Sequence, residues 1–215
     1  MVYKHYGSLK CAVCVLLGLI PLFVFCMKRI VILASGSGSN AQKIIEHFQG
    51  HQSIEVALVL ANKRNAGVLD RCDLLGIPAF YFNSAAFGSS DRLLESVQGI
   101  APDLIVLAGF LKLIPESWLD AFPRKIINIH PALLPKYGGK GMYGMNVHRK
   151  VKEAGEAVSG ISIHYVDARY DEGAMIKQFQ CALDKKDSPE EIAAKVQQLE
   201  HLHYPQVIES LLLER

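Results

Sequence analysis

Short apolar runs alternate with amphipathic segments from Met27 onward, and this alternation constrains the fold more than any other feature of the chain. The runs that are typical of strands cover 29–34, 54–61, 79–82, 103–108 and 125–129. The segments with the helical spacing of apolar residues cover 40–49, 66–75 and 91–98. Strands that alternate with helices of about ten residues predict right-handed βαβ units. We therefore expect an α/β fold with an open, mainly parallel, twisted sheet and helices on both faces.

The strand and helix rhythm changes after Gly160. Two strand-like segments at 161–166 and 174–183 follow each other across a short polar loop, DARYDEG. Such a short connection contains no crossover helix, so these strands are expected to be antiparallel. We therefore predict antiparallel strands beside the parallel part of the sheet, in the C-terminal part of the chain.

A long helical stretch at 188–213 follows these strands. It starts with Ser188-Pro189-Glu190-Glu191, in which serine is suited to the N-cap, proline to the first helical position and Glu191 to the third. Pro205 lies within the stretch and has no amide hydrogen to donate. We expect it to break or kink the helix.

The segment before Met27 has a different character. Residues 11–26 (CAVCVLLGLIPLFVFC) form an apolar run that is shorter than the roughly 20 residues of a spanning helix. No A-x-A-like cleavage site follows it. We expect residues 1–26 to be a dispensable extension and residues 27–215 to form a single domain. A signal peptide or a short membrane anchor, and with it a membrane-tethered interaction protein, is the alternative.

Composition excludes several classes of function. Half of the residues are hydrophobic and a fifth are charged, which fits an ordered soluble protein. The net charge of +2 is too small to favour a nucleic acid or an anionic membrane as the main partner. Outside the extension the chain has only Cys72 and Cys181, which form no C-x-x-C pair. We therefore expect a cytoplasmic protein with no metal and no disulfide framework.

The first motif with chemical meaning is Gly36-Ser37-Gly38-Ser39-Asn40, between the first strand and the first helix. A dinucleotide fingerprint would need glycine where the chain has Ala41. Backbone N–H groups at a helix N-terminus bind anions, and glycines let a ligand approach closely. The motif predicts a single phosphate, bound by the amides of Gly38 to Asn40 and by the Ser39 hydroxyl. The alternative is a plain tight turn in which Ser39 caps the helix.

The second motif is Asn128-Ile129-His130-Pro131-Ala132-Leu133-Leu134-Pro135. Side chains of a strand alternate between its faces, so Asn128 and His130 point the same way at the end of their strand. An amide and an imidazole side by side can both donate a hydrogen bond to a developing oxyanion. A core histidine paired with a backbone carbonyl is the alternative.

A carboxylate, Asp171, lies in a turn further along the chain. Beside His130 it would favour the imidazolium and raise the pKa of that ring.

These motifs together resemble a known family. The strings are SGSGSN, APDLIVLAGF, INIHPALLPKYGGKG and GISIHYVDARYDEG, followed by a helix with Gln197, Glu200 and Tyr204-Pro205. Their combination and order resemble the phosphoribosylglycinamide formyltransferases, the folate-dependent glycinamide ribonucleotide transformylases of purine synthesis. The resemblance covers about residues 27–213 and implies a single formyltransferase domain with a Rossmann-like fold.

The resemblance implies a role for each matching residue. Asn128 matches an oxyanion-binding asparagine, His130 the catalytic histidine, and Asp171 the aspartate that keeps this histidine protonated. The residues expected to contact the glycinamide ribonucleotide are Gly38, Ser39, Asn40, Pro131, Gln197 and Glu200. Those expected to bind the folate are Leu111, Lys112, Leu113, Ile114, Asn128, Asp167, Ala168, Arg169, Tyr170 and Asp171. His164 matches a second histidine near the site.

Two segments depart from the family pattern. The loop after Pro135 is longer than in well-known members and has Asn146 where some have another histidine. Its glycine-rich part, 138–144, is expected to be a mobile loop. The segment after Phe87 is shorter, and Arg92 is only a possible match for the arginine that meets the glutamate tail of the folate.

The resemblance implies that the formyl group of 10-formyltetrahydrofolate passes to the amine of phosphoribosylglycinamide, with no metal and no covalent intermediate. The expected partners are these small molecules, with no nucleic acid and no membrane, and the protein is expected to be a monomer or a homodimer. A formyltetrahydrofolate hydrolase or another folate formyltransferase is the nearest alternative. A phosphate-binding module without catalysis is a more distant one.

Overall fold

The computed structural model describes residues 27–83, 87–88 and 91–214. The apolar extension 1–26 lies outside the described residues, so its dispensability stays a prediction. The described strands are β1 (Lys28–Ala34), β2 (Ile54–Ala61), β3 (Ala79–Tyr81), β4 (Leu104–Leu107), β5 (Ile126–His130), β6 (Val158–Tyr165) and β7 (Met175–Ala182). The described helices are α1 (Ser39–Phe48), α2 (Gly67–Leu75), α3 (Arg92–Ile100), α4 (Glu116–Ala121), α5 (Met145–Glu153) and α6 (Pro189–Leu213).

The strands form one sheet in the order β3-β2-β1-β4-β5-β6-β7. The five strands from β3 to β5 are parallel to one another. β6 is antiparallel to β5, and β7 is antiparallel to β6. The predicted mainly parallel sheet with antiparallel strands in the C-terminal part is therefore confirmed. The strand order reverses at β1, because β2 and β4 lie on opposite sides of it, and open α/β sheets bind ligands outside such a point.

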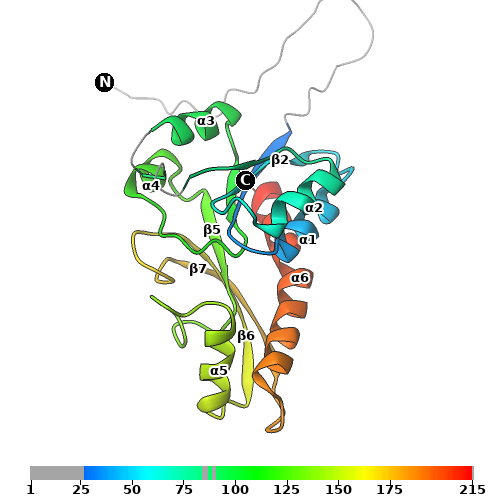
Figure 1. Cartoon of the computed structure of the whole chain (residues 1–215), viewed down its shortest axis with the longest axis vertical. Coiled ribbons are helices and arrows are strands. Elements are labelled where there is room, and N and C mark those ends of the chain that lie inside the picture. Colours follow the sequence, from blue (N-terminus) through cyan, green and yellow to red (C-terminus); the bar gives the residue numbers. More distant parts are fainter. Residues whose placement is uncertain (1–26, 84–86, 89–90, 215) are drawn as a thin grey trace, which may run out of the picture.

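Alternate side chains of the central strands contact two separate hydrophobic layers. Ile30 and Ile32 of β1 face the layer that includes α1, α2 and α6, whereas Val31 and Leu33 face the layer that includes α3 and α4. All four residues of β4 are buried, as expected of a strand covered on both faces. Figure 1 shows the helices on both faces of the sheet, and this part of the prediction is confirmed.

Most elements begin and end within three residues of the predicted bounds, but α4 and α5 were not predicted. α4 is short, and only Trp118 is fully buried within it, so its sequence has no clear helical period. The prediction was a break or a kink at Pro205, and the break is wrong, because α6 continues through this residue without interruption. Proline removes one helical hydrogen bond. The adjacent Tyr204, Val207 and Ile208 are buried in the core, which compensates for that loss.

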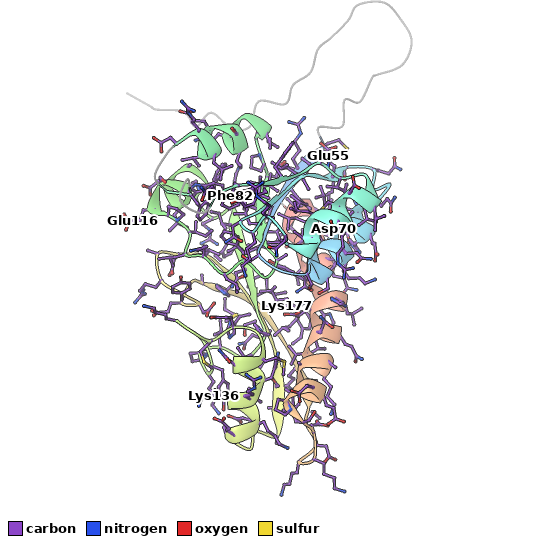
Figure 2. All side chains as sticks on the ribbon, viewed as in Figure 1. Glu55, Asp70, Phe82, Glu116, Lys136 and Lys177 are labelled. Carbon is purple, nitrogen blue, oxygen red and sulfur yellow. The ribbon has the colours of Figure 1, made fainter. Side chains whose placement is uncertain are left out.

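The molecule is elongated in Figure 1, with α5 and the first half of α6 at one end and α1 to α4 at the other. Figure 2 shows Lys136 beside α5, whereas Glu55 and Asp70 lie at the opposite end. The long α6 therefore connects the two ends of the molecule along the sheet.

Ser188 begins α6 with the predicted capping box: its hydroxyl accepts from the Glu191 amide, and the Glu191 carboxylate accepts from the Ser188 amide.

Candidate active site

The loop between β1 and α1 has an uncapped helix N-terminus. The N-cap residue is Gly38, whose φ of 80° is in the left-handed region, and no side chain in the described ranges caps the helix. A Cβ at Gly38 would lie 2.6 Å from the Cβ of Val68, so this position accepts only glycine. The alternative in which Ser39 caps the helix is wrong. Ser39 is the first helical residue, and its hydroxyl accepts from Gln197 at 3.4 Å.

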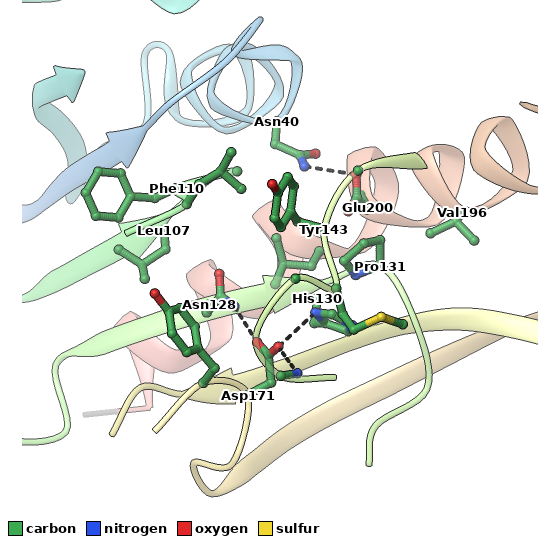
Figure 3. A pocket seen from close by; sticks show the side chains of 18 of the residues that line it. Asn40, Leu107, Phe110, Asn128, His130, Pro131, Tyr143, Asp171, Val196 and Glu200 are labelled. Atoms are coloured by element: carbon green, nitrogen blue, oxygen red, sulfur yellow. Dashed lines mark hydrogen bonds and ion pairs between the residues drawn. The ribbon is translucent and has the colours of Figure 1, made fainter. Parts of the chain in front are cut away.

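A cavity of about 710 Å³ lies next to this loop. Asn40 at the start of α1, Asn128 and His130 at the end of β5, and the segment 111–114 after β4 all line it. Figure 3 shows Asn128 and His130 beside one space, with Asn40 and Glu200 on one side of it and Leu107 and Phe110 on another. The carboxyl ends of three neighbouring parallel strands thus form its base.

His130 is almost completely buried at the end of β5, at 3% exposure. Its Nε2 atom lies 2.7 Å from the backbone carbonyl oxygen of Tyr137, and its Nδ1 atom lies 3.4 Å from Oδ2 of Asp171. A carbonyl oxygen can only accept, so Nε2 carries a proton. The Nδ1 atom therefore faces the carboxylate of Asp171, and His130 is one of the residues that line the cavity (Figure 3).

Burial lowers the pKa of His130 below its usual value, and it outweighs the carboxylate of Asp171 and the carbonyl of Tyr137, which raise this pKa. The nearby His164 acts in the same direction as burial. The predicted effect of Asp171, which raises the pKa of this ring, is confirmed in sign, although burial makes the net change a lowering. The reason is the depth at which the imidazole lies.

Asp171 adopts the left-handed backbone conformation, with φ of 57°. Its Oδ2 atom accepts a hydrogen bond from the Gly139 amide at 2.9 Å, and its Oδ1 atom lies 3.6 Å from Nε2 of His164. Burial alone would raise the pKa of Asp171, but the bond from His164, the charge of His130 and the Gly139 amide together lower it below its usual value. The carboxylate is therefore ionised at neutral pH.

Asn128 completes this group of polar side chains. Its Nδ2 atom lies 3.2 Å from Nε2 of His164 and 3.5 Å from Oδ1 of Asp171. The Nδ1 atom of His164 lies 2.9 Å from the backbone carbonyl oxygen of Tyr165 and donates to it. The structure thus brings Asn128, His130 and Asp171 together, although 43 positions separate Asn128 from Asp171.

The residues predicted to contact the two substrates do not all line the cavity. Those that do are Asn40, Leu111, Lys112, Leu113, Ile114, Asn128, His130, Pro131, Asp167, Arg169, Tyr170, Asp171, Gln197 and Glu200. Gly38, Ser39 and Ala168 are not among the lining residues, although each is a direct neighbour of one. Arg92, the possible match for the tail-binding arginine, is the first residue of α3 and is also absent from the lining.

The sequence prediction missed several lining residues. Lys140, Met142 and Tyr143 come from the glycine-rich segment, and His148 comes from the first half of α5. Tyr143 is half-exposed and extends into the space between Asn40 and His130 in Figure 3. The only signal for these residues was the extra length of this loop, which shows no periodicity.

Two further observations on the described residues concern metal binding and membrane-spanning helices. No group of three or more histidine, cysteine, aspartate or glutamate side chains in this part of the chain could hold a metal ion. Among the helices within the described ranges, none is long and apolar enough to cross a membrane.

The chain belongs to the formyl transferase family, whose profile matches residues 28–208. It is 39% identical over 194 residues to the chloroplastic phosphoribosylglycinamide formyltransferase of Arabidopsis thaliana, covering 87% of this chain and 66% of that relative, which is just under two thirds. It is 37% identical to the phosphoribosylglycinamide formyltransferase of Bacillus subtilis, covering 86% of this chain and 95% of the relative. The structure of glycinamide ribonucleotide transformylase 1 from Symbiobacterium toebii matches with a TM-score of 0.79 and 34% identity, covering 88% of this chain and 89% of that one.

Proposed function

We propose that this protein transfers the formyl group of 10-formyltetrahydrofolate to the primary amine of phosphoribosylglycinamide, a step of purine biosynthesis. One observation carries the proposal: Asn128, His130 and Asp171 meet in a cavity that extends to an uncapped helix N-terminus. The names of the relatives support the choice of both substrates. The site residues predicted from the resemblance keep their proposed roles.

The ribonucleotide is proposed to bind with its phosphate at the N-terminus of α1. The amides of Gly38 to Asn40 and the Ser39 hydroxyl donate to the phosphate, and the partial positive charge of the helix end favours the anion. Gln197 and Glu200 on α6 face the ribose and the amine from the same end of the cavity. This arrangement directs the amine toward Asn128 and His130.

The folate is proposed to bind at the other end of the cavity, against residues 111–114 and 167–171. Leu111 and Leu113 are more than 40% exposed, which leaves apolar surface for the flat pterin ring. The formyl group on N10 then lies beside the polar group at the end of β5. Holding the two reactants in this orientation supplies much of the rate acceleration.

The amine nitrogen is proposed to attack the formyl carbon, forming a new C–N bond and a tetrahedral oxyanion. The Nδ2 group of Asn128 donates to this oxyanion, and the ring of His130 becomes charged because it takes up, in transit to N10, the proton that the attacking amine releases. The bond between the formyl carbon and N10 then breaks, and one proton moves from the amine to N10. Asp171 balances the charge of His130 and positions a water molecule that carries this proton.

An absorbance assay with 10-formyltetrahydrofolate, run with and without phosphoribosylglycinamide, tests this proposal. Loss of the formyl group only when the ribonucleotide is present would support it. Loss of the formyl group without the ribonucleotide would instead indicate a hydrolase. Ligand binding without turnover in either condition would indicate a phosphate-binding module without catalysis.

Residues 27–215 are proposed to carry this activity as a single domain in the cytoplasm. Within the described residues, the first strand begins at Lys28 and the first buried core residue is Ile30. A chain that starts at Met27 should therefore match the full chain in turnover and in the midpoint of thermal unfolding. The protein is proposed to act without nucleic acid, as a monomer or a homodimer, and analytical ultracentrifugation distinguishes these two states.

A further inference from the structure

The turn 137–139 contacts both of the buried groups that face each other at the base of the cavity. The Tyr137 carbonyl accepts from Nε2 of His130 at 2.7 Å, and the Gly139 amide donates to Oδ2 of Asp171 at 2.9 Å. A Cβ at Gly138 would lie 3.3 Å from the Cβ of Asp171, so the turn also packs directly against that residue. The separation of His130 from Asp171 therefore depends on the shape of this turn.

The backbone of the turn needs an anchor. Tyr137 has a φ of 59°, in the left-handed region that bulky side chains rarely occupy. Such a conformation persists only where the surroundings fix it. Here the phenol hydroxyl donates to Oε1 of Glu156 at 2.9 Å, and Nζ of Lys136 donates to the same oxygen at 2.8 Å. Glu156 thus holds two consecutive side chains of the segment that presents the carbonyl to His130.

We propose that Glu156, acting through Tyr137, is a positioning residue that fixes the orientation and the protonated nitrogen of His130. The inference rests on the proposed function in one respect, since that function makes His130 a catalytic residue. Glu156 lies in the connection between α5 and β6 and does not line the large cavity, so it touches neither substrate.

The Glu156 carboxyl and the Tyr137 phenol keep the same protonation states around neutral pH. The bonds from Lys136 and Tyr137 lower the pKa of the Glu156 carboxyl, and burial together with Glu156 raises the pKa of the Tyr137 phenol. The carboxylate therefore accepts and the phenol donates at neutral pH. The groups that face His130 itself are Asp171, His164 and His148.

The test compares Glu156→Ala, Glu156→Gln and Tyr137→Phe with a matched control. Glu153→Gln is suitable as the control, because Glu153 forms an exposed ion pair with Lys150 on α5 and lies outside the cavity lining. The turnover number and both KM values are measured with 10-formyltetrahydrofolate and phosphoribosylglycinamide. The protonated nitrogen of His130 and its titration are followed by 15N NMR of the free full-length protein, with a His130→Gln spectrum for assignment.

Glu156→Ala and Tyr137→Phe are expected to lower kcat about tenfold with little change in either KM, because a misplaced catalytic group slows chemistry more than binding. The population of His130 with the proton on Nε2 should fall, and its titration should move to lower pH. Glu156→Gln should recover most of both properties, since its amide oxygen still accepts from Tyr137, and Glu153→Gln should match the wild type.

The inference is overturned if Glu156→Ala keeps the wild-type kcat and the wild-type NMR signature of His130. It is also overturned if kcat falls while the His130 signature stays unchanged, because Glu156 would then have only a structural role. If the wild type transfers no formyl group but the His130 signature still responds to Glu156→Ala, the proposed function fails and the positioning role stands.

Discussion

Asn40 and Glu200, 160 positions apart in the sequence, are joined by a hydrogen bond of 3.0 Å from Nδ2 of Asn40 to Oε2 of Glu200. This bond connects the N-terminus of α1 to the middle of α6 across one wall of the cavity (Figure 3). Burial raises the pKa of Glu200 to about 7, although the bond from Asn40 opposes the rise. The other amide atom of Asn40, Oδ1, is buried and has no hydrogen-bond partner among the described residues.

The raised pKa of Glu200 predicts a specific dependence of stability on pH. In the folded protein this carboxyl binds a proton up to about pH 7, whereas its usual value is 4.5. The contribution of Glu200 to the free energy of unfolding is therefore fully present below pH 4.5 and is lost as the pH rises toward 7 and beyond. Glu200→Gln should remove this loss. The free energy of unfolding of Glu200→Gln minus that of the wild type should therefore increase by about 1–3 kcal/mol from pH 5 to pH 8.

Urea unfolding of both proteins at several pH values measures this difference. Glutamine keeps an oxygen that accepts from Asn40, so the hydrogen bond survives the substitution. A difference between wild type and Glu200→Gln that stays constant from pH 5 to 8 would contradict the assignment. Glu190→Gln, at the start of the same helix, is the matched control and should leave the pH dependence unchanged.

Two glycines of the loop between β1 and α1 should respond differently to alanine. Gly38→Ala forces a side chain into a left-handed backbone and against Val68, so it should lower the free energy of unfolding by at least about 1–3 kcal/mol. The added Cβ of Gly36→Ala meets no atom of the described part of the chain within 4 Å, so this variant should change the free energy of unfolding by less than about 0.5 kcal/mol. Chemical denaturation measures both values.

A second substitution tests how much of the loss at Gly38 comes from one atom of Val68. Val68→Ala in the Gly38→Ala background removes the contact with Cγ2, but the Cβ and the Cα of residue 68 stay at 2.6 and 2.7 Å and the backbone strain remains. The double variant should therefore recover only part of the lost stability. Equal effects of alanine at Gly36 and at Gly38 would refute this account of the loop.

The sheet could be predicted because its elements carry their periodicity locally. Ala41, Ile44, Ile45 and Phe48 of α1 recur with helical spacing, and all four are buried. The uninterrupted apolar run of β4 likewise indicated a central strand. α5 gave no such signal, because the glycines before it and the charged residues within it obscure the three buried positions.

The site could be predicted only in part, for a physical reason. Asn128 and His130 are two residues apart on one strand, so their common orientation follows from strand geometry. Their proximity to Asp171 depends on how the turn 137–139 and the segment after β6 pack together, and no local pattern encodes that packing. The net lowering of the His130 pKa could not be predicted for a related reason, because burial depends on the whole fold.

Asp171→Asn should move the His130 titration to lower pH. The carboxylate is the main group that raises the pKa of His130 against the effect of burial, so its removal leaves burial opposed only by the Tyr137 carbonyl. NMR titration of 15N-labelled histidine in the free protein measures the shift. An unchanged or higher His130 pKa in Asp171→Asn would show that the carboxylate does not act on this ring.

Asn128→Ala and His130→Ala should each lower kcat for formyl transfer by about 10²–10³, because each removes one of the two groups proposed to stabilise the oxyanion. Gln49→Ala, at the exposed C-cap of α1, is the control and should retain full activity. Both groups act on the same oxygen, so the double variant should lose less than the product of the single losses. The absorbance assay at saturating concentrations of both substrates measures all four proteins beside the wild type, and near-normal turnover in either single variant would refute the assignment.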